Sequence, residues 1–510
     1  MKYYLGIDNG GTMTKAALYT AQGREVSVAS VSTKMITPRP DFTERDMDEM
    51  WDANCGVIRA VLQKSKVSPS DIGCVACCGH GKGLYLWGMD NKPVRNGVLS
   101  TDNRAWEYVE RWKEDGTAKK IFAKTCQHIM ACQPVSLLAW LKDNEPESVE
   151  KIKWIFECKD YVRFRLTGQA FGEITDYSGT NLINLYTKAY DEELLEAFGL
   201  ESLRDKLPPL CKSTDLCGTI TRETAEKTGL QEGTPVAGGM FDIDACAIAV
   251  DGAHTDRICM IAGTWSINEY IRKTPVTDGS VLMNSIFCLP DYYLIEESSA
   301  TSAGNNEWFI RTLLPEVKEQ VQKDGGSIYK VADQWVESIP VEEFCPIFTP
   351  FLMASNVHPN AKASFVGISN YHTRKHLMRG VYEGIAFSHR YHFDKLMATR
   401  SQPPVCIRLA GGVTHSKIWV QIFADIMNLP IEIVEVNETG AFGCAIAAAV
   451  AVGEYRDFAA ASKTMIPVSN PVLPVPSHHQ IYEERYIMYR RILDSMDGIW
   501  NDMNHLMGKK

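Results

Sequence analysis

One turn near the middle of the 510-residue chain places a carboxylate where it could do chemistry. Residues 236–244 read VAGGMFDID: a strand entry, two glycines, and an acidic residue at the start of a helical pattern rich in small residues. A carboxylate presented into a cleft in this way can accept a proton from a substrate hydroxyl. The pattern predicts a catalytic base in this turn, and spacing alone leaves Asp242 and Asp244 as candidates.

A second stretch, residues 8–15 (DNGGTMTK), has the composition of a phosphate-binding turn. Backbone N–H groups of a Gly-rich turn form an anion site around Gly11, and Thr12 and Lys15 can donate to phosphate oxygens. Asp8 is suited to hold, through water, a Mg²⁺ ion that bridges those phosphates. The alternative is an ordinary glycine-containing hairpin turn. The spacing is not that of a P-loop, which needs G-x-x-x-x-G-K.

Two stretches in the second half of the chain offer related chemistry. Residues 263–266 (GTWS) form a turn between two predicted strands and provide the same kinds of donor as the first hairpin. Residues 409–416 (LAGGVTHS) leave a strand through a glycine pair and enter a helix, so that backbone can approach a flat ring or a phosphate closely. The alternative for this junction is a plain strand-to-helix turn.

Residues 79–83 (GHGKG) put a histidine and a lysine among three glycines after a buried strand. Asp102 and Arg104 follow in a polar turn about twenty residues on. Polar side chains on such loops suit the recognition of sugar hydroxyls. The alternative is a solvated surface loop.

The elements around these stretches predict a mixed-sheet α/β fold in two related halves. Strands at 3–7, 15–19 and 25–31 form a meander, followed by a helix capped by Asp46 and a buried strand at 72–78. A second pair of strands, 258–262 and 267–271, resembles the first hairpin. Further predicted elements are helices at 374–397 and 418–427 and a strand at 405–409. We expect an N-terminal domain over residues 1–250 and a C-terminal domain over 251–510.

Several other patterns lead to expectations of structure rather than chemistry. The Gly/Ala-rich segment 440–449 predicts a helix packed very closely on its neighbour or on a ligand. The tyrosines of the last helix predict a docking face, and a homodimer is a reasonable expectation. Cys74 and Cys77 are expected in a core strand rather than at a metal, and His478 with His479 is expected to be a loop pair without partners.

The bulk composition excludes several classes of partner. Hydrophobic residues make up 45% and charged residues 23%, as in an ordinary globular protein. The net charge is -10 and no dense Lys/Arg block occurs, so neither nucleic acid nor an anionic membrane is an expected partner. No signal-peptide core precedes Asp8, and the longest apolar run, 441–453, is too short to span a bilayer. With fifteen cysteines expected as reduced thiols, we expect a cytoplasmic protein.

Taken together and in order along the chain, these motifs resemble those of the FGGY carbohydrate kinases. The matching stretches are DNGGT at the first hairpin, E-x-D-x-x-x-x-W in Glu44, Asp46 and Trp51, G-G-x-x-D ending at Asp242, GT at the second hairpin, and GG-x-x-x-S-x-x-W-x-Q-x-x-A-D over 411–425. Within the family, GKGLYLW at 81–87, LSTDNRA at 99–105 and PVSLLAWLK at 134–142 most resemble bacterial L-xylulose kinases.

The resemblance implies two ribonuclease-H-like, actin/hexokinase-like domains with an interdomain catalytic cleft for ATP, Mg²⁺ and a sugar. It selects Asp242 over Asp244 as the general base. The roles that it implies for other residues are the following: Gly11, Thr12 and Lys15 at the first phosphate site, Thr264 at the second, Gly304, Gly412 and Ser416 on the nucleotide side, Gly81, Lys82 and Asp102 at the sugar, and Asp8 at the metal.

The sugar loop departs from the D-xylulose kinase pattern. Gly81-Lys82-Gly83 stands where those enzymes have Met-His-Gly, and Ser100 stands where they have Trp. These differences favour a ketose other than D-xylulose, and L-xylulose is the expected substrate. The alternatives are 3-keto-L-gulonate, another ketose, or a polyol such as erythritol or glycerol. An actin-like or chaperone-like ATPase, which needs no acceptor sugar, is the alternative of a different class.

Overall fold

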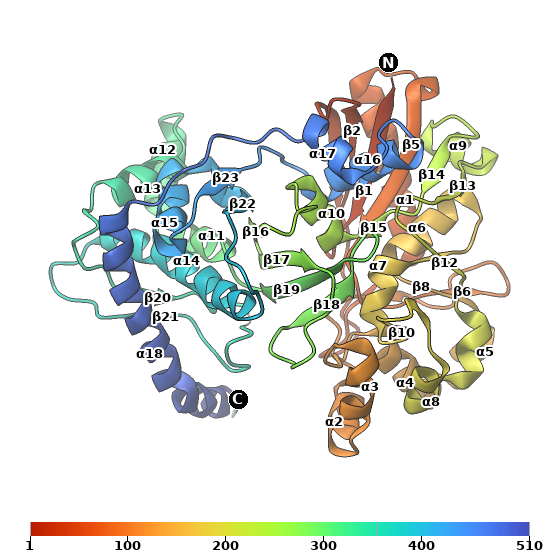
Figure 1. Cartoon of the computed structure of the whole chain (residues 1–510), viewed down its shortest axis with the longest axis horizontal. Helices are drawn as coiled ribbons and strands as arrows, with labels where there is room; N and C mark the ends of the chain where they lie inside the picture. Colours follow the sequence, from red (N-terminus) through yellow and green to blue (C-terminus); the bar gives the residue numbers. More distant parts are fainter. Residues whose placement is uncertain (1, 354, 509–510) are drawn as a thin grey trace. The chain divides into compact units, whose positions relative to one another are not determined.

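The computed structural model describes residues 2–353 and 355–508. The chain folds into two compact units, each assembled from separate segments of the sequence (Figure 1). Unit 1 contains Met1–Ala253, Ile271–Ile295 and Glu438–Ile466, and unit 2 contains His254–Tyr270, Glu296–Asn437 and Pro467–Lys510.

Unit 1 is built on a seven-stranded mixed sheet. Its order is β13-β14-β5-β1-β2-β3, with β15 also paired to β5. The hairpin pairs are antiparallel, whereas β5 runs parallel to β1, β14 and β15. The strands are β1 (Tyr3–Asn9), β2 (Met13–Thr20), β3 (Glu25–Ser32), β5 (Ile72–Gly79), β13 (Leu216–Thr219), β14 (Pro235–Ala237) and β15 (Met240–Phe241). The predicted meander and the buried strand after it are confirmed.

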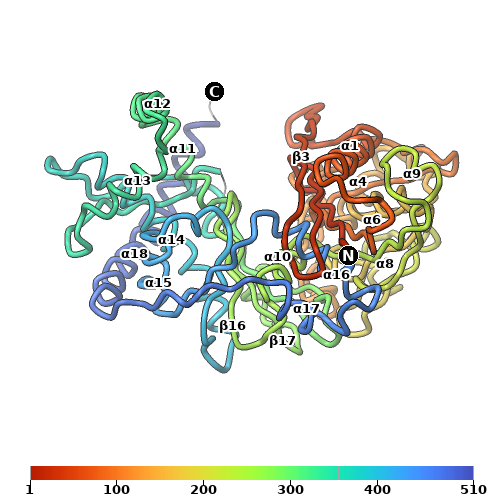
Figure 2. Tube along the Cα trace, turned by 90° about the horizontal axis from the view of Figure 1, so that it is seen from above, coloured from red at the N-terminus to blue at the C-terminus, as the bar shows by residue number. Residues whose placement is uncertain are grey.

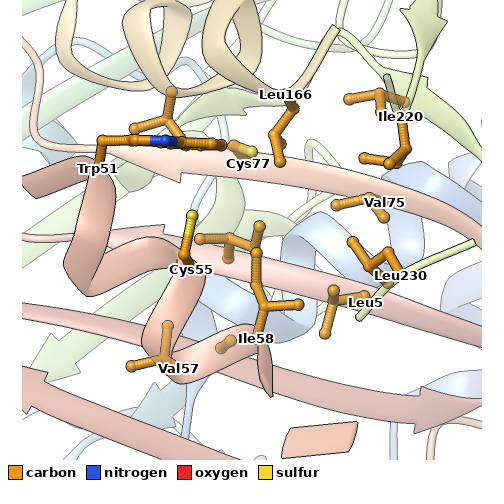
Figure 3. Close-up of a cluster of buried hydrophobic side chains, with 14 of the residues drawn as sticks. Leu5, Trp51, Cys55, Val57, Ile58, Val75, Cys77, Leu166, Ile220 and Leu230 are labelled. Carbon is orange, nitrogen blue, oxygen red and sulfur yellow. The ribbon is translucent and has the colours of Figure 1, made fainter. Parts of the chain in front are cut away.

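Helix α1 (Met47–Ser65) covers one face of this sheet. Its N-cap is Asp46, whose side chain accepts hydrogen bonds from the N–H groups of Asp48 and Glu49, as predicted. The buried face of α1 packs on β2 and β3, and Figure 2 shows the helix running alongside β3. Figure 3 shows its side chains meeting those of β1, β5 and α6 (Cys158–Thr167) in one apolar cluster.

Helix α16 (Thr439–Ala451) lies on the opposite face of the sheet from α1. Leu5 and Ile7 belong to the apolar cluster under α1, and side chains alternate along a strand, so Gly6 faces the other way. A Cβ on Gly6 would lie 1.8 Å from the carbonyl oxygen of Ala441. A Cβ on Gly443 would likewise lie 2.0 Å from the carbonyl oxygen of Ala245 in α10 (Asp242–Ala249). The predicted close packing of the Gly/Ala-rich helix is confirmed, and it packs on strand and helix neighbours.

Unit 2 repeats the strand arrangement at the centre of unit 1. Its strands β16, β22 and β23, with most of β17 and β19, belong to a six-stranded sheet of order β18-β19-β17-β16-β22-β23, whose β18 is part of the Ile271–Ile295 segment of unit 1. Strand β16 pairs antiparallel with β17 and parallel with β22, just as β1 pairs antiparallel with β2 and parallel with β5. The strands are β16 (Arg257–Ala262), β17 (Ser266–Arg272), β18 (Met283–Ile286), β19 (Tyr293–Ser299), β22 (Cys406–Ala410) and β23 (Ile431–Ile433). The predicted similarity of the two hairpins is therefore present in the topology.

The main helices of unit 2 include the helices predicted at residues 374–397 and 418–427. They are α11 (Gly304–Leu313), α12 (Pro315–Lys323), α13 (Ile328–Glu337), α14 (Arg374–Ala398), α15 (Lys417–Met427) and α18 (Pro476–Met507). The tyrosine face of α18 packs within unit 2: Tyr482, Tyr486 and Tyr489 are at most 3% exposed and surround the ring of Phe387 in α14. The predicted docking face is therefore occupied by the protein's own core.

Two minor expectations have definite outcomes. His478 and His479 do have a partner, Asp425: the ring of His478 is 2.9 Å from its carboxylate, and that of His479 is 2.9 Å from its backbone carbonyl. The sequence expectation was wrong because the partner lies in a different helix, about fifty residues away. Cys74 and Cys77 lie in β5 and are fully buried, as expected. Among the residues described, no helix is both long enough and apolar enough to cross a membrane.

Candidate active site

The turn before Asp242 is shaped by two glycines that no other residue could replace without strain. Gly239 has φ of +75°, and a Cβ there would lie 1.9 Å from the carbonyl oxygen of Cys77 in β5. A Cβ on Gly238 would lie 2.2 Å from the carbonyl oxygen of Lys212. The backbone can therefore run tightly beside β5 before Asp242 begins α10 as a half-buried residue.

Sheet register brings three features to one edge of the sheet in unit 1: Asp8, Asp242 and the loop at residues 79–83. This loop was predicted to bind the sugar and is called the sugar loop below. Asp8 of β1 and Met240 of β15 both pair with Cys78 of β5, from opposite sides. Asp242 follows two residues after Met240, and the sugar loop begins where β5 ends at Gly79. The carboxyl ends of parallel strands meet at one edge of a sheet, where ligands bind in open α/β folds.

Asp244, the alternative to Asp242, is placed differently. It is fully buried, and its Oδ1 accepts a hydrogen bond of 3.0 Å from the backbone N–H of Cys288. Burial, together with the nearby carboxylate of Glu173, raises the pKa of Asp244 well above its usual value. Full burial makes Asp244 less accessible to a substrate hydroxyl than the half-buried Asp242.

The first hairpin presents Gly11 and Thr12 at its tip, with Thr12 exposed. Lys15 lies across the strand pair from Asp8, and its Nζ is 2.7 Å from a carboxylate oxygen of Glu438. Burial lowers the pKa of Lys15, but the hydrogen bond and charge of Glu438, with the charge of Asp8, raise it further and hold the pKa above its usual value. Lys15 is thus a fixed cation beside the hairpin, and Glu438 is a contact that the sequence did not indicate.

Asp8 is suited to a metal ion that takes most of its ligands from phosphate and water. Its Oδ2 would lie 2.7 Å from a Cβ on Gly440, so only a glycine there leaves room for the carboxylate. Burial raises the pKa of Asp8, while the neighbouring Lys15 acts to lower it. No group of three or more His, Cys, Asp or Glu side chains in the described parts of the chain can hold a metal ion. One carboxylate fits Mg²⁺, which keeps several waters and binds substrate phosphates.

The sugar loop is buried rather than solvated. His80 is 6% exposed, and its Nε2 is 2.8 Å from the hydroxyl of Tyr85. Burial and the charge of Arg45 lower the pKa of His80 to about 3, so its ring is neutral. A Cβ on Gly81 would lie 2.4 Å from the ring of Phe241. Lys82 is half-buried, and its Nζ lies 5.7 Å from the centre of the Phe241 ring; Phe241 directly precedes Asp242 in the chain. The surface-loop alternative is wrong for these residues.

Asp102 lies in a network of charges. Its carboxylate accepts hydrogen bonds from the backbone N–H of Thr43 at 2.7 Å and from two guanidinium nitrogens of Arg104 at 2.8 and 2.9 Å. Arg104 also binds Glu44, a residue of the E-x-D-x-x-x-x-W motif. Both oxygens of Asp102 are therefore engaged by protein donors.

Two buried carboxyls near the sugar loop were not singled out by the sequence. Asp176 is 2% exposed, and its Oδ1 would lie 2.9 Å from a Cβ on Gly81. Burial raises the pKa of Asp176 to about 7, although Lys159 at 3.2 Å acts to lower it. Glu157 is 1% exposed, and neither carboxylate oxygen has a hydrogen-bond partner within the described structure. Their signal in the sequence is weak, because acidic residues in a helical region usually face solvent.

The four nucleotide-side residues predicted in the second half line one cavity of unit 2. Thr264, Gly304, Gly412 and Ser416 border a space of about 620 Å³. Gly304 begins α11, Ser416 caps α15, and Gly412 follows Gly411, whose φ is +96°. The volume lies within the range of small-molecule sites.

The same cavity has an aromatic wall. Tyr382 and Trp419 are stacked, with ring centres 4.0 Å apart and planes inclined by 13°. Asp333 accepts hydrogen bonds from the hydroxyls of Ser416 at 2.6 Å and Tyr382 at 3.0 Å. A flat apolar wall beside hydroxyls and a carboxylate suits a purine nucleoside. Trp419 belongs to the 411–425 motif, whereas Tyr382 lies in the predicted helix 374–397, where no motif marked it.

The predicted residues therefore form one group in each unit. Unit 1 holds Asp8, Gly11, Thr12, Lys15, Gly81, Lys82, Asp102 and Asp242, and unit 2 holds Thr264, Gly304, Gly412 and Ser416. The first group supplies carboxylates, a phosphate-type turn and a loop suited to sugar, whereas the second supplies a nucleoside-type cavity. Both kinds of group are needed by a sugar kinase with a two-domain α/β fold, because such an enzyme passes phosphate from a nucleotide to a hydroxyl.

Known proteins agree with this class. Residues 3–249 match the N-terminal domain of the FGGY family of carbohydrate kinases, and residues 258–452 match its C-terminal domain. The chain belongs to the FGGY family of carbohydrate kinases. Kinases of this family transfer phosphate from ATP to a small sugar.

Similar proteins cover nearly the whole chain. The L-xylulose/3-keto-L-gulonate kinase of Escherichia coli K12 is 36% identical over 499 residues, 98% of each chain. A probable L-xylulose kinase of Pasteurella multocida is 35% identical over 98% of this chain and 100% of that one. The solved xylulose kinase of Lactobacillus acidophilus has a TM-score of 0.88 at 24% identity, covering 99% and 100% of the two chains. The glycerol kinase of Plasmodium falciparum has a TM-score of 0.81 at 21% identity, covering 96% and 98%. These two structures establish the fold.

Proposed function

We propose that this protein phosphorylates a ketopentose with ATP, converting L-xylulose to L-xylulose 5-phosphate. The observation that carries the proposal is the register across Cys78, which brings Asp8 and the strand leading into Asp242 to the edge where the sugar loop begins. The names of the relatives from Escherichia coli and Pasteurella multocida support this substrate.

In the proposed reaction, Asp242 accepts the proton of the terminal sugar hydroxyl as its oxygen attacks the γ-phosphorus in line with the departing ADP. Phosphoryl transfer has a loose transition state, so alignment and neutralisation of charge contribute more than the base does. The N–H groups of the first hairpin and Lys15 bind the transferred group. Mg²⁺, held by Asp8, would neutralise charge on the phosphate oxygens.

The two predicted domains have separate tasks in this proposal. Residues 1–250 supply the sugar loop, the first hairpin and Asp242, and residues 251–510 supply the second hairpin at Thr264 and the nucleoside cavity. Gly304, Gly412 and Ser416 bind the nucleotide, with the stacked pair of Tyr382 and Trp419 against its base. The position of the second hairpin on the wall of that cavity supports this division.

On the sugar side, Lys82 donates to a hydroxyl or carbonyl oxygen. Gly81 lets the backbone of the loop pass close to Phe241 and Asp176, which a side chain at this position would prevent. Asp102 holds the neighbouring loops through Thr43 and Arg104. The nearness of Lys82 to the ring that precedes Asp242 supports a common site.

A coupled assay of ADP release tests the proposal. L-Xylulose, D-xylulose, 3-keto-L-gulonate, erythritol and glycerol are compared at equal concentration, with a sugar-free control. The highest kcat/KM on L-xylulose supports the proposal. A higher kcat/KM on 3-keto-L-gulonate or a polyol would refute L-xylulose as the substrate but would support the proposed phosphoryl transfer from ATP. ATP turnover that does not depend on any acceptor supports the actin-like or chaperone-like ATPase instead.

We also propose a cytoplasmic homodimer. Most of the cysteines are buried thiols in the interior of the described structure, which suits a reducing compartment. Because the tyrosine face of α18 is buried within its own unit, the dimer surface must lie elsewhere. The last turns of α18 carry apolar side chains that are 40–66% exposed, namely Ile499, Met503, Leu506 and Met507. Exposed apolar residues grouped in this way typically mark a contact surface.

A further inference from the structure

Arg45 is a buried cation whose charge meets no carboxylate. Its side chain is among the largest that are fully enclosed, at 2% exposure, and it takes part in no ion pair among the described residues. Among the described residues, the only hydrogen bonds of this side chain run from Nη2 to the carbonyl oxygens of Gly10, at 3.1 Å, and Gly11. Nε and Nη1 are buried and have no partner within the described structure.

Other buried arginines of the protein are compensated by a carboxylate. Arg104 binds Asp102 and Glu44, Arg163 binds Asp160, and Arg379 binds Glu383. Removing a guanidinium from water without an opposite charge costs several kcal/mol, by general estimates for buried ions. A buried arginine without an opposite charge at the base of the phosphate hairpin therefore destabilises the fold, and a negative charge that binds nearby would be attracted to it.

The two carbonyls held by Arg45 determine where the hairpin aims its donors. In a planar trans peptide, the carbonyl oxygen and the N–H of the next residue point in opposite directions. Holding the carbonyl of Gly10 therefore directs the N–H of Gly11 away from the guanidinium. Holding the carbonyl of Gly11 does the same for the N–H of Thr12.

Those two N–H groups are available to a ligand. No hydrogen bond within the described structure uses the N–H of Gly11 or of Thr12, although the carbonyl of Thr12 accepts one from Thr33. Thr12 is exposed and Gly11 is partly exposed. A positive charge on the carbonyl side of a peptide also polarises its N–H and strengthens it as a donor in a buried setting.

We propose that Arg45 is a positioning residue for the phosphate hairpin: it holds and polarises the peptides of Gly10 and Gly11, so that the N–H groups of Gly11 and Thr12 bind the terminal phosphate of ATP. The inference deepens the proposed function, because it explains how the first hairpin would bind the transferred group. Arg45 acts through these peptides and need not touch the nucleotide. The guanidinium charge is balanced when the phosphate anion binds on the far side of the two peptides.

The test compares ligands that differ only in their phosphates. Binding of adenosine, ADP and a non-hydrolysable ATP analogue with Mg²⁺ is measured by calorimetry for the wild type and for Arg45→Gln and Arg45→Lys. Arg45→Gln should leave adenosine binding within twofold, weaken ADP severalfold and weaken the ATP analogue by about tenfold or more, by the usual strength of charge-assisted hydrogen bonds. Arg45→Lys, which keeps the charge but not the fork, should fall between Gln and the wild type.

Arg165→Gln is the matched control. Arg165 lies in the same unit, stacks on Trp51 at 4.9 Å and donates to the hydroxyl of Tyr161, away from the hairpin. The change in affinity caused by Arg165→Gln should be the same for adenosine, ADP and the ATP analogue. Equal weakening of adenosine and of the ATP analogue in Arg45→Gln would show a merely structural role and overturn the inference, as would unchanged binding of all three ligands.

A measurement on the wild type remains decisive where a variant fails to fold. Amide hydrogen exchange at Gly11 and Thr12 should slow when the ATP analogue is added, and adenosine should leave it unchanged. Exchange that the analogue does not slow overturns the inference. Sugar-dependent turnover is measured separately, so failure of the proposed substrate with phosphate-dependent binding intact refutes the function and leaves the role of Arg45 standing.

Discussion

The thiol of Cys78 donates a hydrogen bond of 3.5 Å to Oδ1 of Asp8. Burial is the main reason that the pKa of this thiol is raised well above its usual value, and its interactions with Cys444, Asp8 and Asp242 raise it further. Cys78 is therefore a neutral group between two carboxylates. A thiol at this position donates to Asp8 without adding charge to an already acidic site.

Replacing Asp242 with Asn should lower kcat by about a hundredfold or more, the usual scale for losing a general base. Binding of ATP should change little, because the nucleotide contacts proposed here are made by other residues. The matched variant is Asp244→Asn, which replaces a fully buried carboxyl with a neutral side chain of the same shape and should retain most turnover. Steady-state kinetics measures kcat of both variants. A larger loss of kcat in Asp244→Asn than in Asp242→Asn would refute Asp242 as the general base.

Replacing Gly239 with Ala should abolish activity and lower the thermal midpoint. The new Cβ would lie 1.9 Å from the carbonyl oxygen of Cys77, so the turn before Asp242 must move. Gly233→Ala is the control, because Gly233 has a similar φ of +84° but nothing within 4 Å of a Cβ. That variant should cost only about 1 kcal/mol of backbone strain and remain active. Equal losses in both variants would attribute the effect to the positive φ alone.

Replacing Trp419 with Leu should raise KM for ATP about tenfold and leave KM for the sugar within twofold, because it removes one ring of the stacked pair in the nucleotide cavity. Tyr382→Phe keeps both rings and loses only the hydrogen bond to Asp333, so its KM for ATP should rise less than threefold. Initial rates at varied ATP and saturating sugar provide the comparison. A larger effect in Tyr382→Phe than in Trp419→Leu would argue against stacking.

Because of His80, the free energy of unfolding of unit 1 should decrease as the pH falls below 6.5. The pKa of His80 is lowered to about 3, so between about pH 6.5 and 3 the unfolded chain binds a proton that the folded chain does not. Stability is therefore present above pH 6.5 and is lost as pH falls. From pH 6.5 to 5 this amounts to about 2 kcal/mol, or a few degrees in thermal midpoint.

The measurement compares thermal midpoints at pH 7 and pH 5 for the wild type and His80→Gln. The drop should be smaller in the variant, even if the variant is less stable at pH 7. His505→Gln, at an exposed position near the end of α18, is the control. An identical drop in all three proteins would contradict the prediction.

Replacing Leu506 with Asp should shift a homodimer towards monomer, because it puts a charge on the exposed apolar end of α18. Sedimentation velocity over a range of concentrations is the measurement. Met89→Asp, at another exposed apolar side chain, serves as the control. If Leu506→Asp remains a dimer, the dimer contact does not lie at the end of α18. If the wild type is a monomer, the proposed dimer is refuted.

Local sequence patterns predicted most of the central elements. The meander, the Asp46 cap and the second hairpin all depend on interactions between residues close in the chain, so periodicity and turn composition reveal them. Turn composition drew attention to the stretches that contain Asp8, Lys82, Asp242 and Ser416. The family resemblance supplied the roles expected of these residues, including the choice of Asp242 over Asp244.

The remaining features depend on contacts between distant parts of the chain. Lys15 with Glu438 and Asp425 with His478 join residues that no local pattern connects. Asp176 is buried beside the sugar loop only because Lys159 and its neighbours form an ionic cluster within unit 1. The role of Arg45 was hidden because an arginine in an acidic stretch usually faces solvent.

Helix α16 also has a consequence for the order in which the protein can be completed during synthesis. It covers the Gly6 face of β1 and follows Glu438, the ion-pair partner of Lys15, yet the ribosome makes it more than 400 residues after that strand. The N-terminal unit therefore emerges with one face of its sheet uncovered and waits for the C-terminal unit to be translated. A fragment ending at Ala253 should aggregate, whereas the same fragment joined by flexible linkers to residues 271–295 and 438–466, the other two segments of unit 1, should fold.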